Sequence, residues 1–261
     1  MTSTVVIGGF FGDEGKGKII SYLALHDKPS IVVRGGAGPN AGHTIKDGDK
    51  VYKVRMLPSG FLNKNARVMV GPGVVVNPDV LLKEIDDFNV NGRAYVDNNC
   101  GIIEQSHRDA DSKGQLKEKI GSTGSGTGPA NAERAMRTLK LAKEIDVLEK
   151  LLIDVPLEVN SALDRNENVL IEGTQGTHLS LWHGTYPFVT TKDVTASGIC
   201  ADIGIGPKRV DEVIVVFKSY LTRVGTGPMP GELDADEASK KGWEEFGTVT
   251  GRLRRAAEFN F

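Results

Sequence analysis

The chain has 261 residues, 39% of them hydrophobic, and its 32 basic and 34 acidic side chains give a formal net charge of −2. This length can bury a sizeable core, as one large α/β domain or two small ones. The charge balance argues against a general nucleic-acid-binding surface, no apolar run approaches the roughly 20 residues of a membrane span, and no signal peptide is expected.

The first half of the chain alternates apolar runs with glycine turns and stretches of helical spacing. Residues 3–9 (STVVIGG) predict a buried strand that runs into a glycine turn, and residues 16–25 predict a helix. The same signals then predict a strand at 30–36, a hairpin at 43–58 around Asp47 and Gly48, a strand and loop at 66–76, and a helix at 77–88 with Asn77 as its cap.

The second half begins with a loop rich in glycine, serine and threonine at residues 120–131. A long helical stretch is predicted at 131–163, interrupted near Pro156. Strands that lead into polar or glycine-rich loops are predicted at 168–180 and 211–233, and residues 246–261 predict a basic loop that opens a helix.

This order of elements indicates the fold class. Strands that alternate with helices favour an α/β fold with a mostly parallel central sheet and helices on both faces. Ligands of such sheets bind outside the carboxyl ends of the strands, which is where the glycine loops of this chain fall. The two cysteines, Cys100 and Cys200, are far apart and are interpreted as thiols of a reducing cytosol.

Residues 8–18 (GGFFGDEGKGK) have the features of a phosphate-binding loop. They offer small residues, free backbone N–H groups and a following helix N-terminus, together with Lys16 and Lys18. The loop departs from the usual pattern, because Ile19 stands where a Mg²⁺-binding hydroxyl would be. A tight strand-to-helix turn with solvated charges is the alternative interpretation.

The same loop carries Asp13 and Glu14, whose negative charge would repel a bare phosphate. A carboxylate is tolerated there if Mg²⁺ lies between it and the phosphates. It can also act as a general base for a second substrate. The acid therefore indicates a site that does more than hold phosphate.

Six motifs follow one another along the chain: FGDEGKGK (11–18), GGAGPNAGHT (35–44), STGSGTGPA (122–130), EGTQGTHLSLWHGTYPFVT (172–190), TRVGTGPMPGEL (222–233) and EFGTVTGRLRR (245–255). In this order they resemble adenylosuccinate synthetase in its short, archaeal-type form. That family has a P-loop NTPase-like fold and ligates IMP and L-aspartate with GTP and Mg²⁺. The resemblance implies one such domain over 1–261, with an incomplete C-terminal part, because the family's guanine-reading segments have no counterpart here.

The resemblance also implies how the reaction runs. Asp13 would take the N1 proton of IMP, so that the 6-oxygen attacks the γ-phosphate of GTP and forms 6-phosphoryl-IMP. The amino group of aspartate then displaces that phosphate. His43 would act as the general acid, and Asp13 and the Gly42 carbonyl would be Mg²⁺ ligands.

Three substrate sites are implied by the same resemblance. The GTP site comprises Gly12, Asp13, Glu14, Gly15, Lys16, Gly17, Lys18, Gly42, His43, Thr44 and Arg254. The IMP site comprises Asp13, Glu14, Gly15, Lys16, Asn40, Ala41, Gly42, His43, Thr123, Arg137, Gln175, Thr190 and Arg252. The aspartate site comprises Thr248, Val249, Thr250, Gly251, Arg252, Leu253 and Arg254.

Arg137 would reach the IMP site of the other subunit, which implies a homodimer. The expected location of the protein is the cytoplasm. Glu172, at the end of a predicted strand, could be an acid in a Walker-B-like position. A hydrogen-bonded or solvated loop carboxylate is an equally good interpretation, so Glu172 is not placed in the site. Neither His178 nor His183 has the spacing of a metal ligand.

Two alternatives remain open. The first is a different P-loop nucleotidase or regulatory ATPase, which would keep the phosphate loop but have no use for His43 or residues 248–254. The second is a truncated synthetase that binds nucleotides without catalysis. Preference for GTP over ATP is implied by the resemblance alone.

Overall fold

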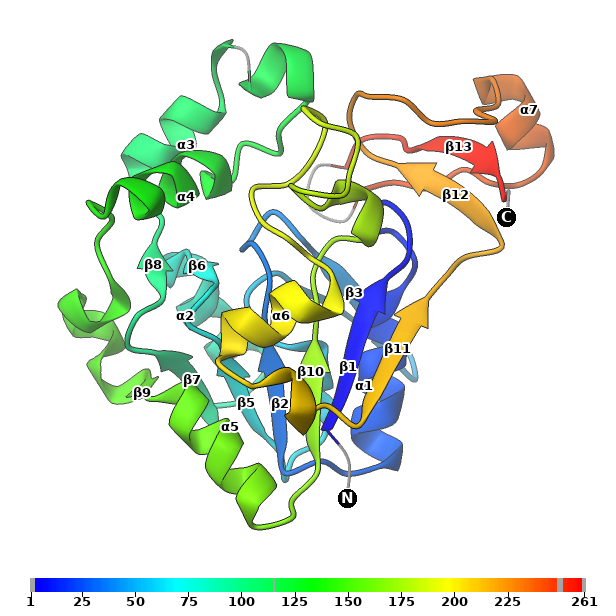
Figure 1. Cartoon of the computed structure of the whole chain (residues 1–261). Coiled ribbons are helices and arrows are strands. Elements are labelled where there is room, and N and C mark those ends of the chain that lie inside the picture. The colour runs from blue at the N-terminus through cyan, green and yellow to red at the C-terminus, as the bar shows by residue number, and fades with distance from the viewer. Residues whose placement is uncertain (1–2, 115, 248–250, 260–261) are drawn as a thin grey trace.

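The computed structural model describes residues 3–114, 116–247 and 251–259. A seven-stranded sheet forms the centre, and each neighbouring pair of its strands is parallel (Figure 1). In spatial order its strands are β11 (Glu212–Val216), β1 (Ser3–Gly8), β10 (Val169–Glu172), β2 (Ile31–Arg34), β5 (Arg67–Val70), β7 (Ala94–Asp97) and β9 (Leu152–Ile153). The prediction of an α/β fold with a mostly parallel sheet is confirmed.

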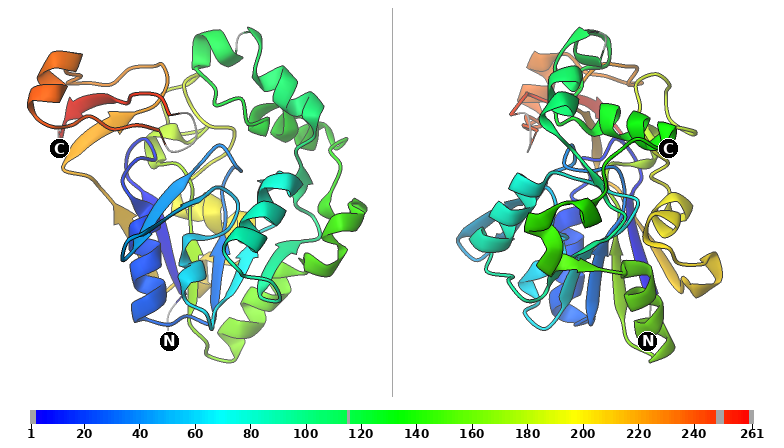
Figure 2. Two further views of the ribbon diagram at one scale, coloured as in Figure 1. Left: turned by 180° about the vertical axis from the view of Figure 1, so that it is seen from behind. Right: turned by 90° about the vertical axis from the view of Figure 1, so that its left-hand side faces the viewer.

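Helices cover both faces of this sheet, as predicted (Figures 1 and 2). On one face the core contains Ile20 of α1 (Lys16–His26) and Leu81 of α2 (Pro78–Asp87). On the other face it contains Val159 of α5 (Val155–Asp164) and Ile199 of α6 (Ala196–Ile203). A parallel sheet needs this double cover, because its strands are apolar on both faces.

Small elements surround the carboxyl ends of the strands. On one side lie α3 (Gln105–Asp111) and α4 (Thr127–Met136), and on the other lie α7 (Ala235–Lys240) and the antiparallel pair β12 (Tyr220–Arg223) and β13 (Arg255–Glu258) (Figure 1). The loops that follow β1, β2 and β10 open between them. Two further pairs are β3 (His43–Asp47) with β4 (Lys50–Val54), and β6 (Val75–Val76) with β8 (Gly101–Ile102).

The local predictions for the first half of the chain are confirmed. The β3–β4 hairpin turns at Gly48, whose φ is 57°, and Asn77 caps α2 by accepting a hydrogen bond from the Val80 N–H. Pro78 occupies the first turn of that helix, where its missing N–H costs nothing.

Three predictions for the second half are wrong. The glycine loop at 120–131 ends early, because α4 begins at Thr127. No long helix occupies 131–163, since α4 ends at Met136 and the chain then forms short 3₁₀ turns, the edge strand β9 and α5. At the C-terminus, residues 255–258 pair with β12 as β13, with Ala256 and Ala257 buried, so tertiary pairing overrides the helix preference of alanine.

Candidate active site

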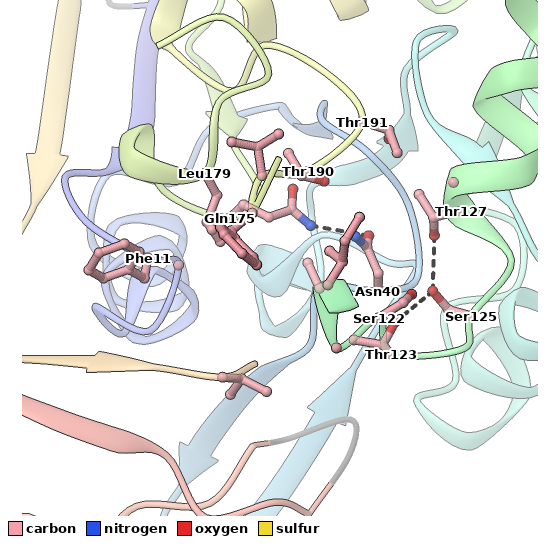
Figure 3. Close-up of a pocket in the computed structure, with 18 of the residues that line it drawn as sticks. Phe11, Asn40, Ser122, Thr123, Ser125, Thr127, Gln175, Leu179, Thr190 and Thr191 are labelled. Carbon is pink, nitrogen blue, oxygen red and sulfur yellow. Dashed lines mark hydrogen bonds between the residues drawn. The ribbon is translucent and has the colours of Figure 1, made fainter. Parts of the chain in front are cut away.

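A pocket of about 340 Å³ lies at the carboxyl ends of the strands, within the usual size of small-molecule sites (Figure 3). The predicted site residues that line it are Gly12, Asp13, Asn40, Ala41, Gly42, His43, Thr123, Gln175, Thr190 and Arg254. Others are described but do not line it: Glu14, Gly15, Lys16, Gly17, Lys18, Thr44, Arg137, Gly251, Arg252 and Leu253. Thr248, Val249 and Thr250 lie outside the described residues.

The contacts of Glu14 explain why the phosphate loop contains this acid. Its carboxylate points into the loop and accepts hydrogen bonds from the backbone N–H groups of Phe10 (2.8 Å) and Gly12 (2.9 Å). The Lys16 ammonium lies 3.0 Å from the same carboxylate, and both side chains are buried. Burial opposes ionisation of Glu14, but Lys16 and the Gly12 N–H outweigh it and lower the pKa of Glu14. This buried ion pair stabilises the conformation of the phosphate loop.

Gly12 and Gln175 hold two loops of the pocket against each other. Gly12 has a φ of +93°, and a Cβ on it would lie 2.9 Å from the Cα of Gln175. Gln175 is itself left-handed, with a φ of 51°, and its side-chain amide donates to Asn40 Oδ1 at 3.1 Å (Figure 3). The close backbone approach therefore places the loop after β10 beside the phosphate loop.

His43, at the start of β3, meets Glu172 at the end of β10. The distance from His43 Nδ1 to Glu172 Oε1 is 2.5 Å, and Ser59 Oγ lies 3.0 Å from both of these atoms. Burial lowers the pKa of His43, and the carboxylate offsets this only in part. Burial opposes ionisation of Glu172, but His43 and Arg34 outweigh it and lower its pKa. Because an ionised carboxylate can only accept, His43 Nδ1–H donates to Glu172, which leaves Nε2 as the second functional atom.

Asp13, the second acid of the loop, faces two cations. Arg254 Nη2 lies 3.3 Å from Asp13 Oδ1, and Arg254 also contacts Glu245, which binds Lys218 at 2.8 Å. Burial raises the pKa of Asp13 to about 6, against the opposing charges of Arg254 and Lys218. A carboxylate with this pKa can both accept and release a proton near neutral pH.

The opposite wall of the pocket consists of hydroxyl groups. Thr123, Ser125 and Thr127 form a chain of hydrogen bonds at 2.9 and 3.0 Å (Figure 3). Asp111, at the end of α3, accepts a bond from the Gly126 N–H at 2.8 Å and thereby fixes this loop. In the described part of the protein the buried Thr190 hydroxyl has no hydrogen-bond partner, although Thr190 lines the pocket.

Two predicted arginines lie elsewhere. Arg137 is exposed at the end of α4, in the left-handed conformation with a φ of 66°. Arg252 is also exposed, and its guanidinium donates to the Gly121 carbonyl at 3.3 Å, next to the hydroxyl wall. The structure therefore brings Asp13, His43 and Arg254 together in one pocket but not these two side chains.

Sequence reasoning missed Glu172, although a signal was present. The carboxylate directly follows a buried apolar strand, VLI at 169–171, and polar groups at the carboxyl ends of parallel strands meet at one edge. Asp111, Ser125, Thr127 and Arg223 also line or fix the pocket and were not predicted. The sequence around these residues does not indicate which side chains face the pocket.

The donors in the pocket fit Mg²⁺. Among the described residues there is no group of three His, Cys, Asp or Glu side chains that could cage a metal ion. Asp13, with its carboxylate, and Gly42 both line the pocket. Mg²⁺ is commonly held by one or two such oxygens together with substrate phosphates.

Comparison with known proteins yields one family. The family model for adenylosuccinate synthetase matches residues 5–146 and 138–260 of the chain. A synthetase from Methanocaldococcus jannaschii is 59% identical over 265 residues, covering 100% of this chain and 77% of the relative. One from Methanococcus aeolicus is 58% identical and is covered to 79% of its length.

Two solved structures share the fold. A fully ligated adenylosuccinate synthetase from Plasmodium falciparum superimposes with a TM-score of 0.91 at 33% identity, covering 99% of this chain and 72% of the other. The cyanophage S-2L succinoaminodeoxyadenylate synthetase, bound to dGMP and dATP as an energy donor, has a TM-score of 0.86 at 29% identity, with 99% and 79% covered. In the described part of the chain no helix is both long and apolar enough to cross a bilayer.

Proposed function

The chain belongs to the adenylosuccinate synthetase family, and on this premise we propose that the pocket described above is where it ligates IMP and L-aspartate with GTP. The products are adenylosuccinate, GDP and phosphate, and the reaction is the first committed step of AMP synthesis from IMP. The family is Mg²⁺-dependent and acts as a homodimer. The proposal treats residues 1–261 as one domain that works in the cytoplasm.

One observation carries the assignment of the site: Asp13 and His43 line the same pocket beside the phosphate loop, and His43 is held by Glu172. The chemistry needs a base for the N1 proton of IMP and an acid that helps the γ-phosphoryl group leave GDP. It also needs positive charge around the triphosphate. Asp13 follows β1 and Glu172 ends β10, two neighbouring strands of the parallel sheet, whereas His43 starts β3 of the separate β3–β4 pair.

Asp13 acts as the base in this proposal. A pKa of about 6 leaves the carboxylate mostly ionised at neutral pH, and its conjugate acid is still strong enough to release the proton afterwards. Removal of the N1 proton makes the 6-oxygen of IMP nucleophilic toward the γ-phosphate. That oxygen then leaves with the phosphate when the aspartate amine attacks C6.

His43 acts as the acid, through Nε2. Burial lowers the pKa of His43 and so favours the neutral ring. An anionic triphosphate beside Nε2 would favour the protonated ring, and Glu172, on Nδ1, would stabilise the positive charge. Glu172 is thus a positioning residue, because it acts through His43.

The phosphate loop and α1 hold the triphosphate in this proposal. The backbone N–H groups of Gly15 and Gly17 lie at the N-terminus of α1, where anions are favoured, and the Lys18 N–H next to them donates to the Gly15 carbonyl. The residues proposed for the GTP site are completed by Gly12, Glu14, Lys16, Gly42, Thr44 and Arg254. Bound Mg²⁺, with Asp13 and the Gly42 carbonyl as ligands, would neutralise charge that develops on the phosphates.

The hydroxyl wall faces IMP in this proposal. Thr123, with Ser125 and Thr127 beside it, would contact the IMP phosphate, and the unpaired Thr190 hydroxyl would gain a partner. Asn40 and Gln175, already bonded to each other, would contact the base. Arg137 of the partner subunit would complete the site, which fits its exposure here.

L-aspartate would bind at residues 248–254 in this proposal. Arg252, which reaches the Gly121 carbonyl beside the hydroxyl wall, and Arg254, which lines the pocket, are the guanidinium groups available for its carboxylates. Gly251 and Leu253 belong to the same loop.

Product formation from IMP, L-aspartate, GTP and Mg²⁺, with each omitted in turn, tests the function. Adenylosuccinate should form only when all four are present. Replacement of IMP by dGMP, and of GTP by ATP or dATP, separates this function from that named for the cyanophage enzyme. GTP hydrolysis that does not need IMP would favour the other P-loop nucleotidases. IMP binding without turnover would favour the non-catalytic alternative.

A further inference from the structure

We propose that Glu245 is a positioning residue, which holds the Arg254 guanidinium in the pocket beside Asp13 and thereby sets where this arginine meets the bound substrates. Glu245 itself does not line the pocket. The inference deepens the proposed function and rests on it, because it needs Arg254 to bind GTP or L-aspartate.

The first observation is that one guanidinium group contacts two carboxylates. Arg254 Nη1 donates to Glu245 Oε2 at 2.5 Å, whereas Arg254 Nη2 lies 3.3 Å from Asp13 Oδ1. The short contact is therefore the one with Glu245, and the longer one is with Asp13. A ligand that takes up the carboxylate of Asp13 would leave Arg254 held at its other nitrogen.

The second observation is that the Glu245 carboxylate is itself held by the segment around β12. Lys218 Nζ lies 2.8 and 2.9 Å from its two oxygens, and the Tyr220 hydroxyl donates to Oε1 at 2.5 Å. Burial opposes ionisation of Glu245, but the hydrogen bonds from Lys218 and Tyr220 outweigh it and lower the pKa of Glu245. Glu245 is therefore an ionised acceptor in a fixed place, which suits a residue that orients an arginine.

A second route leads from Glu245 to Asp13 through a hydroxyl group. Lys218 Nζ also donates to Thr222 Oγ1 at 2.7 Å, and this hydroxyl donates to Asp13 Oδ2 at 3.3 Å. Glu245 is thus linked to one oxygen of Asp13 through Arg254 and to the other through Lys218 and Thr222. These side chains close a ring in which two carboxylates alternate with two cations, so that their charges balance.

The backbone separates this role from simple closure of the loop. The segments 245–247 and 251–254 are joined by main-chain hydrogen bonds, from the Arg254 N–H to the Glu245 carbonyl at 2.8 Å and from the Gly247 N–H to the Arg252 carbonyl at 2.9 Å. These bonds do not involve the Glu245 side chain. Substitution of the carboxylate should therefore keep the two segments joined and release the guanidinium.

The test is a double-mutant cycle on Glu245 and Arg254 in the full 261-residue chain. Glu245→Gln keeps the size of the side chain but replaces an acceptor oxygen by an NH₂ group, which cannot accept from Arg254 or Lys218. We expect about tenfold lower kcat/KM for L-aspartate and about fivefold weaker GTP binding in calorimetry. The KM for IMP should change by less than about twofold, because Arg254 is not proposed to contact IMP.

In the Arg254→Met background, Glu245→Gln should change GTP binding and the L-aspartate dependence by less than about twofold, because its effect passes through the arginine. A carboxylate with a merely structural role would cost the same in both backgrounds. Glu158→Gln is the matched control. Glu158, on α5, pairs with Arg67 at 2.7 Å, and its side chain is 36% exposed against 26% for Glu245. This variant should behave as the unchanged chain.

A milder variant keeps the test decisive if Glu245→Gln does not fold. Tyr220→Phe removes one hydroxyl that holds Glu245, so it should weaken GTP binding about twofold, and this effect should also disappear with Arg254→Met. The proposal is overturned if the variants bind GTP and use L-aspartate as the unchanged chain does. Additive effects with Arg254→Met would overturn it as well.

GTP binding needs no ligation, so the two proposals can fail separately. A chain that shows the coupling in GTP binding but forms no adenylosuccinate would support the role of Glu245 and contradict the proposed function. Ligation with additive effects of the two substitutions would do the reverse. A chain that neither ligates nor binds GTP would overturn both.

Discussion

The imidazole of His43 and the carboxylate of Glu172 face each other at 2.5 Å, although the two residues lie 129 positions apart in the chain. Glu172 is fully buried and also accepts a hydrogen bond from the Ser59 backbone N–H. The pair joins the start of β3 to the end of β10. Because Nδ1 of His43 is bound to Glu172, Nε2 is the ring nitrogen that remains available to a ligand in the pocket.

Glu172→Gln should lower kcat on the order of 10²-fold, because the amide cannot stabilise a protonated His43. The KM for IMP should change little, since Glu172 is not proposed to touch substrate. Steady-state kinetics would measure this split, with the exposed Glu149→Gln as a matched control. An unchanged kcat in a folded Glu172→Gln protein would remove the positioning role.

Asp13→Asn should reduce turnover by about 10²- to 10⁴-fold and leave most IMP binding intact, because it removes the proposed base but keeps the size of the side chain. Calorimetry would measure IMP binding, and product formation would measure turnover. Turnover at the normal rate would show that another group takes the N1 proton.

The same substitution should stabilise the fold. The pKa of Asp13 is about 6 in the folded protein and near 3.8 when unfolded, so between these pH values the folded form binds more protons. The free energy of unfolding therefore falls as pH rises through this window, and the loss persists above it. Asp13→Asn should raise the free energy of unfolding at pH 7 by about 1 to 3 kcal/mol. Urea unfolding at pH 4 and pH 7 would measure this, and the gain should disappear at pH 4.

Gly12→Ala should disrupt the pocket more than Gly48→Ala does. Both glycines have positive φ, so alanine is strained at each by about 1 kcal/mol. At Gly48 a Cβ meets nothing within 4 Å, whereas at Gly12 it lies 2.9 Å from the Gln175 backbone. The Gly12 variant should also lose GTP and IMP affinity, and the Gly48 variant should keep both. Equal affinities in the two variants would contradict the close approach of the two loops.

Arg137→Leu should weaken IMP binding by about 1.5 to 3 kcal/mol, as expected for a charged hydrogen bond. If Arg137 serves the other subunit, a 1:1 mixture with Asp13→Asn subunits should recover about a quarter of the normal activity. Half of the dimers are then mixed, and each mixed dimer has one intact site. A verified mixed dimer without activity would confine Arg137 to its own subunit.

The sequence predicted the elements that position the site better than those that only connect it. The strand–glycine–helix signal at 3–25 was strong, because burial, turn and helix spacing agree there. At 131–163 the apolar spacing suggested one helix, but the chain has to travel from α4 to the edge strand β9, and this tertiary requirement prevails.

The candidate site shows the same division. Asp13 and His43 lie in sequence motifs from which their place in the site can be predicted. The place of Glu172 depends on its contact with His43, which lies 129 residues away in the chain. The role of Glu14 was also hidden, because only the folded loop shows its carboxylate bound to the Phe10 and Gly12 N–H groups. Local patterns identify residue types suited to the chemistry. Which of them face one another is settled by the tertiary packing, which brings the β3–β4 hairpin against the end of β10.

The central claim is that this pocket activates the 6-oxygen of IMP by phosphorylation before aspartate attacks. IMP labelled with oxygen-18 at that position tests it most directly, in a reaction with GTP, Mg²⁺ and L-aspartate followed by mass spectrometry of the released phosphate. The account predicts that each phosphate formed with adenylosuccinate carries the label. Adenylosuccinate formed together with unlabelled phosphate would contradict it.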